Sequence, residues 1–348
     1  MRGAVSCFLF LFSLFISTVL VGGPLIRPAL AEAPSTTLPL CKGVNLIEKL
    51  KAEKPDEHKA LLEGAASEIN SNGVFWKITG SDGHVSYLLG TMHTTDPQVT
   101  NLPDSARVAL KQSKRVLVEV ADLSPQAVAG VMGKRPDLFF SLQGNRLNTM
   151  LSETDYKVVV EAAQKAGMPG HMVPVLKPWF ASVSFFAVPN CEKLRLNAKE
   201  PVLDKLVETW GKETGAEIVG LETLEEQFAA FNSIPLNDQI TLVENGVHTK
   251  DLAQDIYSTT IDLYKNRQLG LIMPLSLLYV RDRVKSLSAN ASFKAILINK
   301  RNRTMHERAL PHVQKGGAFI AVGALHLTGQ VGLVELFRQS GFQVEKVF

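Results

Sequence analysis

Two histidines in this chain are preceded by the same pattern, an apolar run that ends in Gly-x-x-His. The first run ends at Gly90 and leads to His93, and the second ends at Gly323 and leads to His326. A buried strand that presents a histidine at its carboxyl end has this pattern. A glycine three residues before each histidine lets the backbone turn sharply or approach a ligand closely. The repetition therefore favours one shared site over two incidental histidines.

Two glutamates follow apolar segments of the same kind. Glu119 comes after residues 115–118, and Glu222 comes after residues 217–221. A buried, ionised carboxylate is costly unless it is paired, hydrogen-bonded or bound to a cation. Two imidazoles and two carboxylates suit one divalent ion with an open coordination position, or an ion with three protein ligands beside a separate glutamate base.

We therefore predict a metal site built from these two histidines and two glutamates. The predicted ligands are His93, Glu119, Glu222 and His326. The ion would polarise a carbonyl and activate a water, while the glutamate that is not a ligand takes the proton. Our working assignment makes Glu119 the base and Glu222 the ligand, although the reverse assignment stays open. The spacing matches no compact signature such as His-Glu-x-x-His, so the tertiary fold must bring these side chains together.

A charged run at residues 300–303 supplies further candidates. In a functional interpretation, Asn302 or Arg303 faces the crevice and binds the developing oxyanion or a substrate carboxylate. The alternative is a solvated helix face with little energetic value. We carry Asn302 and Arg303 forward as catalytic candidates together with Glu119.

The elements that must position these groups are strands separated by helices. Strand patterns end at or near the four predicted ligands, and a turn at residues 81–84 predicts a β-hairpin that leads into Gly90. Helical patterns fill most of the remaining chain, including residues 224 to about 273, where we expect breaks at Pro235 and Gly246. This alternation predicts an α/β fold, with α+β as the alternative, in which many helices flank a central, mostly buried sheet. Ligands bind beyond the carboxyl ends of strands in such sheets.

The composition argues against a nucleic-acid partner and allows a large core. The chain has 348 residues, of which 45% are hydrophobic, and its formal net charge is +3. The 37 Lys and Arg and the 34 Asp and Glu are interspersed, without the basic stripe that a phosphate backbone favours. No change of composition divides residues 41–348, so we expect a single domain with a helical lobe at about 124–210. The oligomeric state stays open.

The first residues predict an export signal. Arg2 provides a positive start, residues 5–21 are apolar, and small residues precede a cleavage point near Ala31. We therefore expect a signal peptide at residues 1–31 and a disordered tail at residues 32–40. A retained membrane anchor is the alternative, because the apolar run is long enough to span a bilayer.

Export also changes how the cysteines are interpreted. After cleavage we expect no stable membrane span and a periplasmic or secreted location. Cys41 and Cys191 then remain as one pair in an oxidising compartment, where a disulfide is plausible. Two free, buried thiols are the alternative, and the sequence gives no distance that decides between them.

Several motifs of the chain, taken together, resemble those of the TraB/GumN family. They are residues 87–93 and 322–326, Val118-Glu119, Lys177-Pro178-Trp179, Gly220-Leu221-Glu222-Thr223 with Glu226-Gln227, and Arg301-Asn302-Arg303. That family is related to the Tiki metalloproteases and, more distantly, to erythromycin-esterase-like and ChaN-like proteins. The resemblance covers nearly all of residues 41–348.

The resemblance implies a Tiki-like α/β fold and a metal-dependent hydrolase. The positions that match the family's active site are His93, Glu119, Glu222 and His326. Tiki proteins cut peptide bonds with manganese or cobalt as the favoured ion, so the resemblance implies such an ion, with zinc as another option, and a peptide or small-molecule substrate. Two other functions stay open. They are a non-catalytic periplasmic protein that binds a metal, haem or peptide, and a metal-independent hydrolase in which His and Glu act alone.

Overall fold

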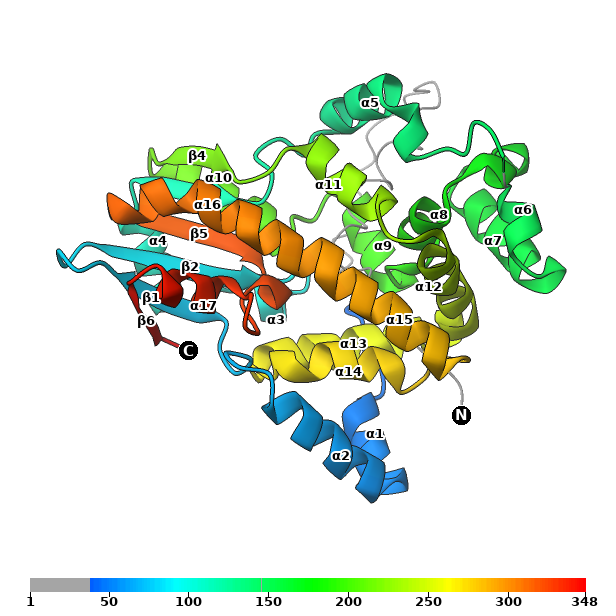
Figure 1. Ribbon diagram of the computed structural model, residues 1–348, viewed down its shortest axis with the longest axis horizontal. Helices are drawn as coiled ribbons and strands as arrows, with labels where there is room; N and C mark the ends of the chain where they lie inside the picture. Colours follow the sequence, from blue (N-terminus) through cyan, green and yellow to red (C-terminus); the bar gives the residue numbers. More distant parts are fainter. Residues whose placement is uncertain (1–37, 145) are drawn as a thin grey trace.

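Six strands form one mixed sheet in the computed structural model, which describes residues 38–144 and 146–348 (Figure 1). The strands are β1 (Phe75–Thr79), β2 (Val85–Thr91), β3 (Arg115–Val118), β4 (Glu217–Gly220), β5 (Ala318–Gly323) and β6 (Gln343–Lys346), in the order β4-β3-β5-β2-β1-β6. Neighbours from β4 to β2 are parallel, whereas β1 runs antiparallel to β2 and to β6. The predicted α/β fold with a central sheet is thereby confirmed.

Helices cover both faces of this sheet. They include α4 (Asp104–Gln112) and α10 (Leu203–Glu213) on one face, and α16 (Arg301–Gln314) and α17 (Leu333–Gln339) on the other. The side chains of each strand alternate between the two faces, as strand geometry requires. On β3, Val116 and Val118 belong to one hydrophobic core, while Leu117 belongs to a second core that also contains Met305 of α16 and Phe337 of α17. The central strands are therefore buried on both sides.

A second group of helices packs beside the sheet (Figure 1). It comprises α5 (Pro125–Lys134), η2 (Pro136–Leu138), α6 (Leu147–Met150), α7 (Glu153–Lys165), η3 (Gly170–Val175), α8 (Pro178–Phe186), α9 (Asn190–Asn197), α11 (Leu224–Asn232), α12 (Leu236–Thr249) and α15 (Arg283–Phe293). The expected break at Gly246 is wrong, because α12 continues through it. A Cβ at Gly246 would lie 2.7 Å from Cβ of Phe186, so this glycine permits the close packing of α8 and α12. α10 begins within the lobe predicted at about residues 124–210, ends at Glu213 and packs on β3 and β4.

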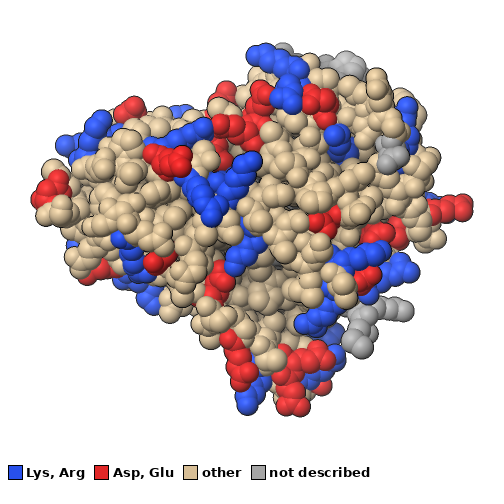
Figure 2. Space-filling model, in the orientation of Figure 1, with Lys and Arg blue, Asp and Glu red and all other residues tan. Residues whose placement is uncertain are grey.

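The remaining elements connect these two groups. They are α1 (Leu46–Glu53), α2 (Pro55–Ala66), α3 (Pro97–Thr100), η4 (Lys250–Leu252), α13 (Ala253–Lys265), η5 (Leu269–Leu271), α14 (Ile272–Leu277), η6 (Lys294–Lys300) and η7 (Ala324–His326). A disulfide joins Cys41, in the segment before α1, to Cys191 in α9. On the face shown in Figure 2, Lys and Arg side chains are mixed with Asp and Glu side chains.

Two expectations concern residues at the start of the chain. The predicted signal peptide at residues 1–31 lies outside the described residues, as does most of the tail predicted at residues 32–40. Within residues 38–144 and 146–348, no helix is both long and apolar enough to cross a membrane.

Candidate active site

The four predicted ligands follow the carboxyl ends of four parallel strands. His93 follows β2, Glu119 follows β3, Glu222 follows β4 and His326 follows β5. β2 pairs with β5 so that Gly90 lies opposite Val322, which places the two Gly-x-x-His motifs on neighbouring strands. The amide of Glu222 donates to the carbonyl of Glu119 over 2.7 Å and continues the pairing of β3 and β4 beyond their ends. The sheet therefore brings all four residues to one edge.

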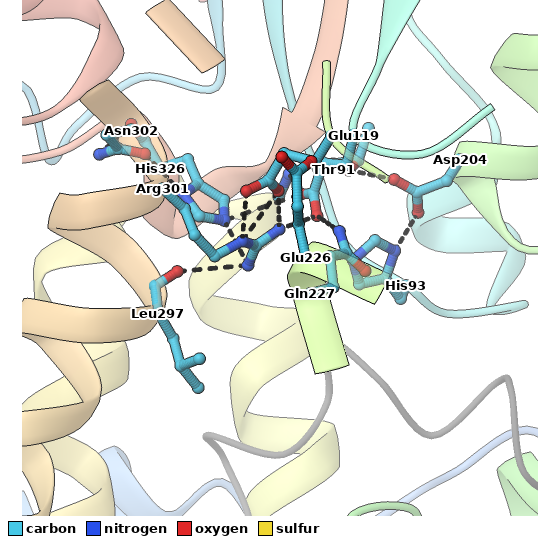
Figure 3. A network of polar contacts seen from close by, with 12 residues as sticks. Thr91, His93, Glu119, Asp204, Glu226, Gln227, Leu297, Arg301, Asn302 and His326 are labelled. Atoms are coloured by element: carbon cyan, nitrogen blue, oxygen red, sulfur yellow. Dashed lines mark hydrogen bonds and ion pairs between the residues drawn. The ribbon is translucent and has the colours of Figure 1, made fainter. Parts of the chain in front are cut away.

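His93 is held by an aspartate from the opposite half of the chain (Figure 3). Its Nδ1 lies 2.5 Å from Oδ2 of Asp204, at the start of α10, and the hydroxyl of Thr91 donates to Oδ1 of the same carboxylate over 2.5 Å. Nε2 of His93 is buried and has no hydrogen-bond partner among the described residues. Burial alone would lower the pKa of His93, but the Asp204 carboxylate outweighs it and raises that pKa.

His326 is held by a neutral side chain. Its Nδ1 lies 2.6 Å from Oδ1 of Asn302, whose amide nitrogen donates to the carbonyls of Val331 over 2.7 Å and of His326 over 3.2 Å. These donations orient the Asn302 amide, so Nδ1 of His326 carries the proton and Nε2 carries the lone pair. His326 is fully buried, and burial lowers its pKa to about 3. His326 therefore stays neutral at pH values at which His93 is readily protonated.

Arg301 joins the two carboxylates. Its Nη2 lies 2.8 Å from Oε2 of Glu119 and 2.6 Å from Oε2 of Glu222, and its Nε donates to Glu222 over 2.9 Å. Its Nη1 lies 3.4 Å from Nε2 of His326. Figure 3 shows the guanidinium of Arg301 next to the imidazole of His326. A buried cation paired with two buried carboxylates offsets their desolvation.

The two carboxylates differ in their surroundings. The Oε1 atom of Glu119 accepts from the amide of Gly323 over 2.7 Å and lies 3.8 Å from Nε2 of His326. Burial alone would raise the pKa of Glu119, but Arg301 and both histidines hold it well below its usual range. Burial raises the pKa of Glu222, and the attraction of Arg301 offsets this only in part. Glu119 is therefore the more firmly ionised of the two.

A π-helical segment explains how two consecutive residues of α16 reach this edge. Residues 294–300 form the π-helix η6, and both Arg301 and Asn302 after it are buried. Such segments are rare and occur frequently at functional sites. Arg303, the next residue, is exposed, so the structure does not bring this predicted catalytic residue into the group. Successive helical residues point about 100° apart, and the third one faces solvent.

Sequence reasoning missed several members of this group. In sequence, Asp204 is an ordinary acidic residue in the first turn of a predicted helix, and no sequence pattern links it to His93. Gln227 and Arg301 belong to the motifs of the family resemblance, but no sequence pattern gave either of them a role in the site. Nε2 of Gln227 donates to Oε2 of Glu119 over 3.2 Å. Their signal is tertiary, because each comes from a helix far in sequence from the strand whose residue it contacts.

The donor chemistry partly fits a metal ion. Two histidines whose Nδ1 atoms are held by other side chains are typical of metal ligands, and the unpartnered Nε2 of His93 fits a cation. Among the described residues, however, no three His, Cys, Asp or Glu side chains come close enough together to hold an ion. Arg301 supplies the positive charge that contacts both carboxylates.

Comparisons with known proteins give a family and two curated relatives. The sequence matches the model of the TraB/PrgY/gumN family over residues 74–346. Metalloprotease TIKI2 of Danio rerio is 24% identical over 311 residues, which cover 75% of this chain and 58% of the relative. Metalloprotease TIKI1 of Homo sapiens is 25% identical over 333 residues, which cover 82% of this chain and 63% of the relative. The chain thus spans about six-tenths of the length of these curated relatives. No solved structure matches the chain.

Proposed function

Because the chain belongs to the TraB/PrgY/gumN family, we propose that it is a metal-dependent hydrolase that cleaves peptide or similar amide bonds. Its similarity to two proteins named metalloproteases supports this class of reaction. The observation that carries the proposal is the state of the two histidines at one sheet edge. Asp204 and Asn302 occupy their Nδ1 atoms, so each ring can bind a metal only through Nε2. Nε2 of His93 has no hydrogen-bond partner among the described residues, and Nε2 of His326 has a single weak hydrogen-bond contact, 3.4 Å from Nη1 of Arg301.

In this proposal His93, His326 and Glu119 hold a divalent ion. Glu119 takes the place that the sequence alone assigned to Glu222, because Arg301 contacts both oxygens of Glu222 but only Oε2 of Glu119. Glu119 stays ionised and has one oxygen near Nε2 of His326, as a ligand requires. The ion, when bound, supplies a Lewis acid that polarises the scissile carbonyl. Manganese or cobalt follows from the family resemblance, and zinc suits the same donors.

Glu222 and Arg301 act together on the proton and on the developing charge. Burial raises the pKa of Glu222, which suits a group that accepts a proton from the attacking water near neutral pH. A proton on Glu222 weakens its pair with Arg301. The guanidinium is then available for the oxyanion that forms on the substrate. Asn302 contributes by fixing the orientation of His326.

Metal analysis of protein purified without chelator, combined with turnover of a peptide library, tests this function. The wild type is expected to retain a divalent ion and to hydrolyse peptides. His93→Ala and Glu119→Gln are expected to lose the ion, whereas Glu222→Gln is expected to keep it and to lose turnover. Glu226→Gln changes an exposed carboxylate in the first turn of α11 and serves as the matched control. If no ion is retained and no added ion stimulates hydrolysis, metal dependence is refuted.

A metal-independent hydrolase is the second candidate. It is favoured by the contacts of Arg301, which already neutralises both carboxylates, and by the lack of a three-residue ligand group among the described residues. Hydrolysis that persists in excess chelator would support it. A protein that retains a metal, haem or peptide and hydrolyses nothing would instead be a binding protein.

The proposed location is outside the cytoplasm, periplasmic or secreted. The disulfide between Cys41 and Cys191 supports export, because such bonds persist mainly in oxidising compartments. The predicted signal peptide at residues 1–31 agrees with this location. Amino-terminal sequencing of the mature protein tests it, and a mature chain that begins at Glu32 is the expected result.

A further inference from the structure

The segment that carries His93 is an irregular stretch of buried chain. Residues 92–96 connect β2 to α3 without helix or strand, and apart from His93 every one of them is buried. Buried backbone outside regular structure must find hydrogen-bond partners elsewhere. Here side chains from distant helices provide them, so the position of His93 depends on residues that do not contact it.

Thr95 receives most of these contacts from α9. The carboxylate of Glu192 accepts from the amide of Thr95 over 2.6 Å and from its hydroxyl over 3.0 Å. Arg195 donates to the Thr95 hydroxyl over 2.8 Å and to its carbonyl over 3.1 Å. Glu192 is 1% exposed and Arg195 is 7% exposed, so water does not compete for these bonds. Every polar group of Thr95 is thus bound by α9.

The neighbouring residue is held in a similar way. The hydroxyl of Tyr257 donates to Oγ1 of Thr94 over 2.6 Å, and the amide of Leu203 donates to the Thr94 carbonyl over 3.3 Å. Leu203 precedes Asp204, the residue that binds Nδ1 of His93. α9 therefore binds Thr95, while α10 binds the Thr94 carbonyl and the His93 ring.

The disulfide lies next to the α9 residues that bind Thr95. Cys191 directly precedes Glu192, and α9 begins without a side-chain hydrogen bond at its N-cap. Its partner, Cys41, belongs to the segment in which the carbonyl of Leu38 accepts from Arg195 over 3.4 Å. The bond is the covalent link that holds the first turn of α9 against this segment.

From these contacts we propose that Glu192 is a positioning residue for His93, and that the Cys41–Cys191 disulfide keeps Glu192 in place. Reduction of the disulfide releases Thr95 and thereby loosens the contact between His93 and Asp204. The chain then reaches its working geometry only after oxidation. The consequence for catalysis rests on the proposed function, whereas the structural coupling does not.

Hydrogen exchange of the full chain tests the coupling without any substrate. Reduction of the wild type and the variant Glu192→Met are each expected to speed exchange of the Thr95 amide at least about tenfold, because that amide loses its buried carboxylate acceptor. Amides of β5 should keep their protection. Glu200→Met changes the exposed carboxylate near Arg195 and is the matched control. Unchanged exchange at residues 92–96 after reduction overturns the proposal, and so does equal acceleration in β5.

A second readout follows His93 itself. The proton that Nδ1 shares with Asp204 is expected to give a downfield resonance in the oxidised wild type, assigned by its loss in His93→Gln. It should broaden or disappear on reduction and in Glu192→Met, and it should persist in Glu200→Met. In the double variant Cys41→Ser/Cys191→Ser it should already be lost and should not respond to reductant. A signal that survives reduction overturns the proposal. If no peptide is ever hydrolysed, these results still decide the coupling.

Discussion

The two Gly-x-x-His motifs share an apolar run, a glycine and a histidine, but differ in how the fold supports them. His93 lies in an irregular buried segment and faces a carboxylate, Asp204. His326 lies in the short helix η7, is fully buried and faces a neutral amide, Asn302. The pKa of His93 is raised, while that of His326 is lowered to about 3. One motif therefore produces two electrostatic states.

The difference teaches that the helices, rather than the strands, decide the chemistry of each histidine. The strands place both rings at one edge of the sheet, because β2 and β5 are parallel neighbours. Asp204 comes from α10 and Asn302 from α16, and these two helices lie on opposite faces of the sheet.

Removal of Arg301 is expected to have the largest effect on stability, at the carboxylates beside His326. Arg301→Met leaves the buried carboxylates of Glu119 and Glu222 without their cation, which should lower the free energy of unfolding by about 3–5 kcal/mol. Urea unfolding at pH 7 measures the loss. Arg303→Met, on the exposed side of the same helix, should change stability by no more than about 0.5 kcal/mol. Equal stability of the two variants would show that the ion pairs contribute nothing.

Asp204→Asn gives His93 a neutral amide partner, as His326 already has in Asn302. The amide keeps the shape of the partner and removes its charge, so His93 loses the interaction that raises its pKa. Metal affinity or activity should fall by about 10–100-fold, as when a partner of a ligating histidine is replaced. Isothermal titration with Mn²⁺ checks this, with Asp104→Asn in the first turn of α4 as the control. Wild-type affinity for Mn²⁺ in Asp204→Asn would mean that the charge of Asp204 does not contribute to metal binding.

Acid should separate the two histidines in the metal-free protein. His326 has a folded pKa of about 3, below its unfolded value of about 6.5, so the unfolded chain binds the proton first. Its contribution to stability is lost as pH falls from about 6.5 towards 3, at about 1.4 kcal/mol per pH unit, or about 2 kcal/mol at pH 5. His93 has the opposite sign, because its raised pKa gives stability that is present at low pH and is lost as pH rises through that pKa.

Unfolding of the wild type, His326→Gln and His93→Gln at pH 5, pH 6.5 and pH 8.5 measures both contributions. The loss of stability between pH 6.5 and pH 5 should shrink in His326→Gln, and the loss between pH 6.5 and pH 8.5 should shrink in His93→Gln. If both variants change the loss in the same pH window, the contrast between the two histidines is contradicted.

The strands and their end residues were accessible from sequence because they depend on local patterns. Apolar runs that end at a glycine predicted where His93 and His326 would lie, and an isolated buried glutamate drew attention to Glu119. The break predicted at Gly246 failed, because tertiary packing against Phe186 uses the glycine for close contact and the helix continues.

The partners of the histidines could not be predicted in this way. Asp204 lies 204 − 93 = 111 residues from His93, and no periodicity connects a helix start to a strand end that far away. The choice among Arg301, Asn302 and Arg303 depends on a π-helical turn, for which the sequence has no recognised signal. The positions of strand ends can thus be predicted from local sequence, whereas the side chains that set the pKa values of the histidines are brought to them by the tertiary fold.

The smallest expected effect concerns the glycine that the two motifs share in sequence but use differently. A Cβ at Gly90 would lie 2.9 Å from Cα of Ala324, in the second motif, and 2.9 Å from Cδ2 of Leu327. Gly90→Ala should therefore push η7 away from β2 and cost about 1–2 kcal/mol of stability, since the leucine can yield and the backbone cannot. Thermal unfolding measures this cost.

Gly130→Ala in α5 is the matched control, because a Cβ there meets no atom within 4 Å and alanine favours the helix by about 1 kcal/mol. Gly323, the equivalent glycine of the second motif, instead donates its amide to Glu119. If Gly90→Ala is as stable as Gly130→Ala, the first glycine is not what brings the two motifs together. If it is destabilised as expected, Gly90 provides the space that η7 needs beside β2, while Gly323 provides a hydrogen bond to a proposed ligand.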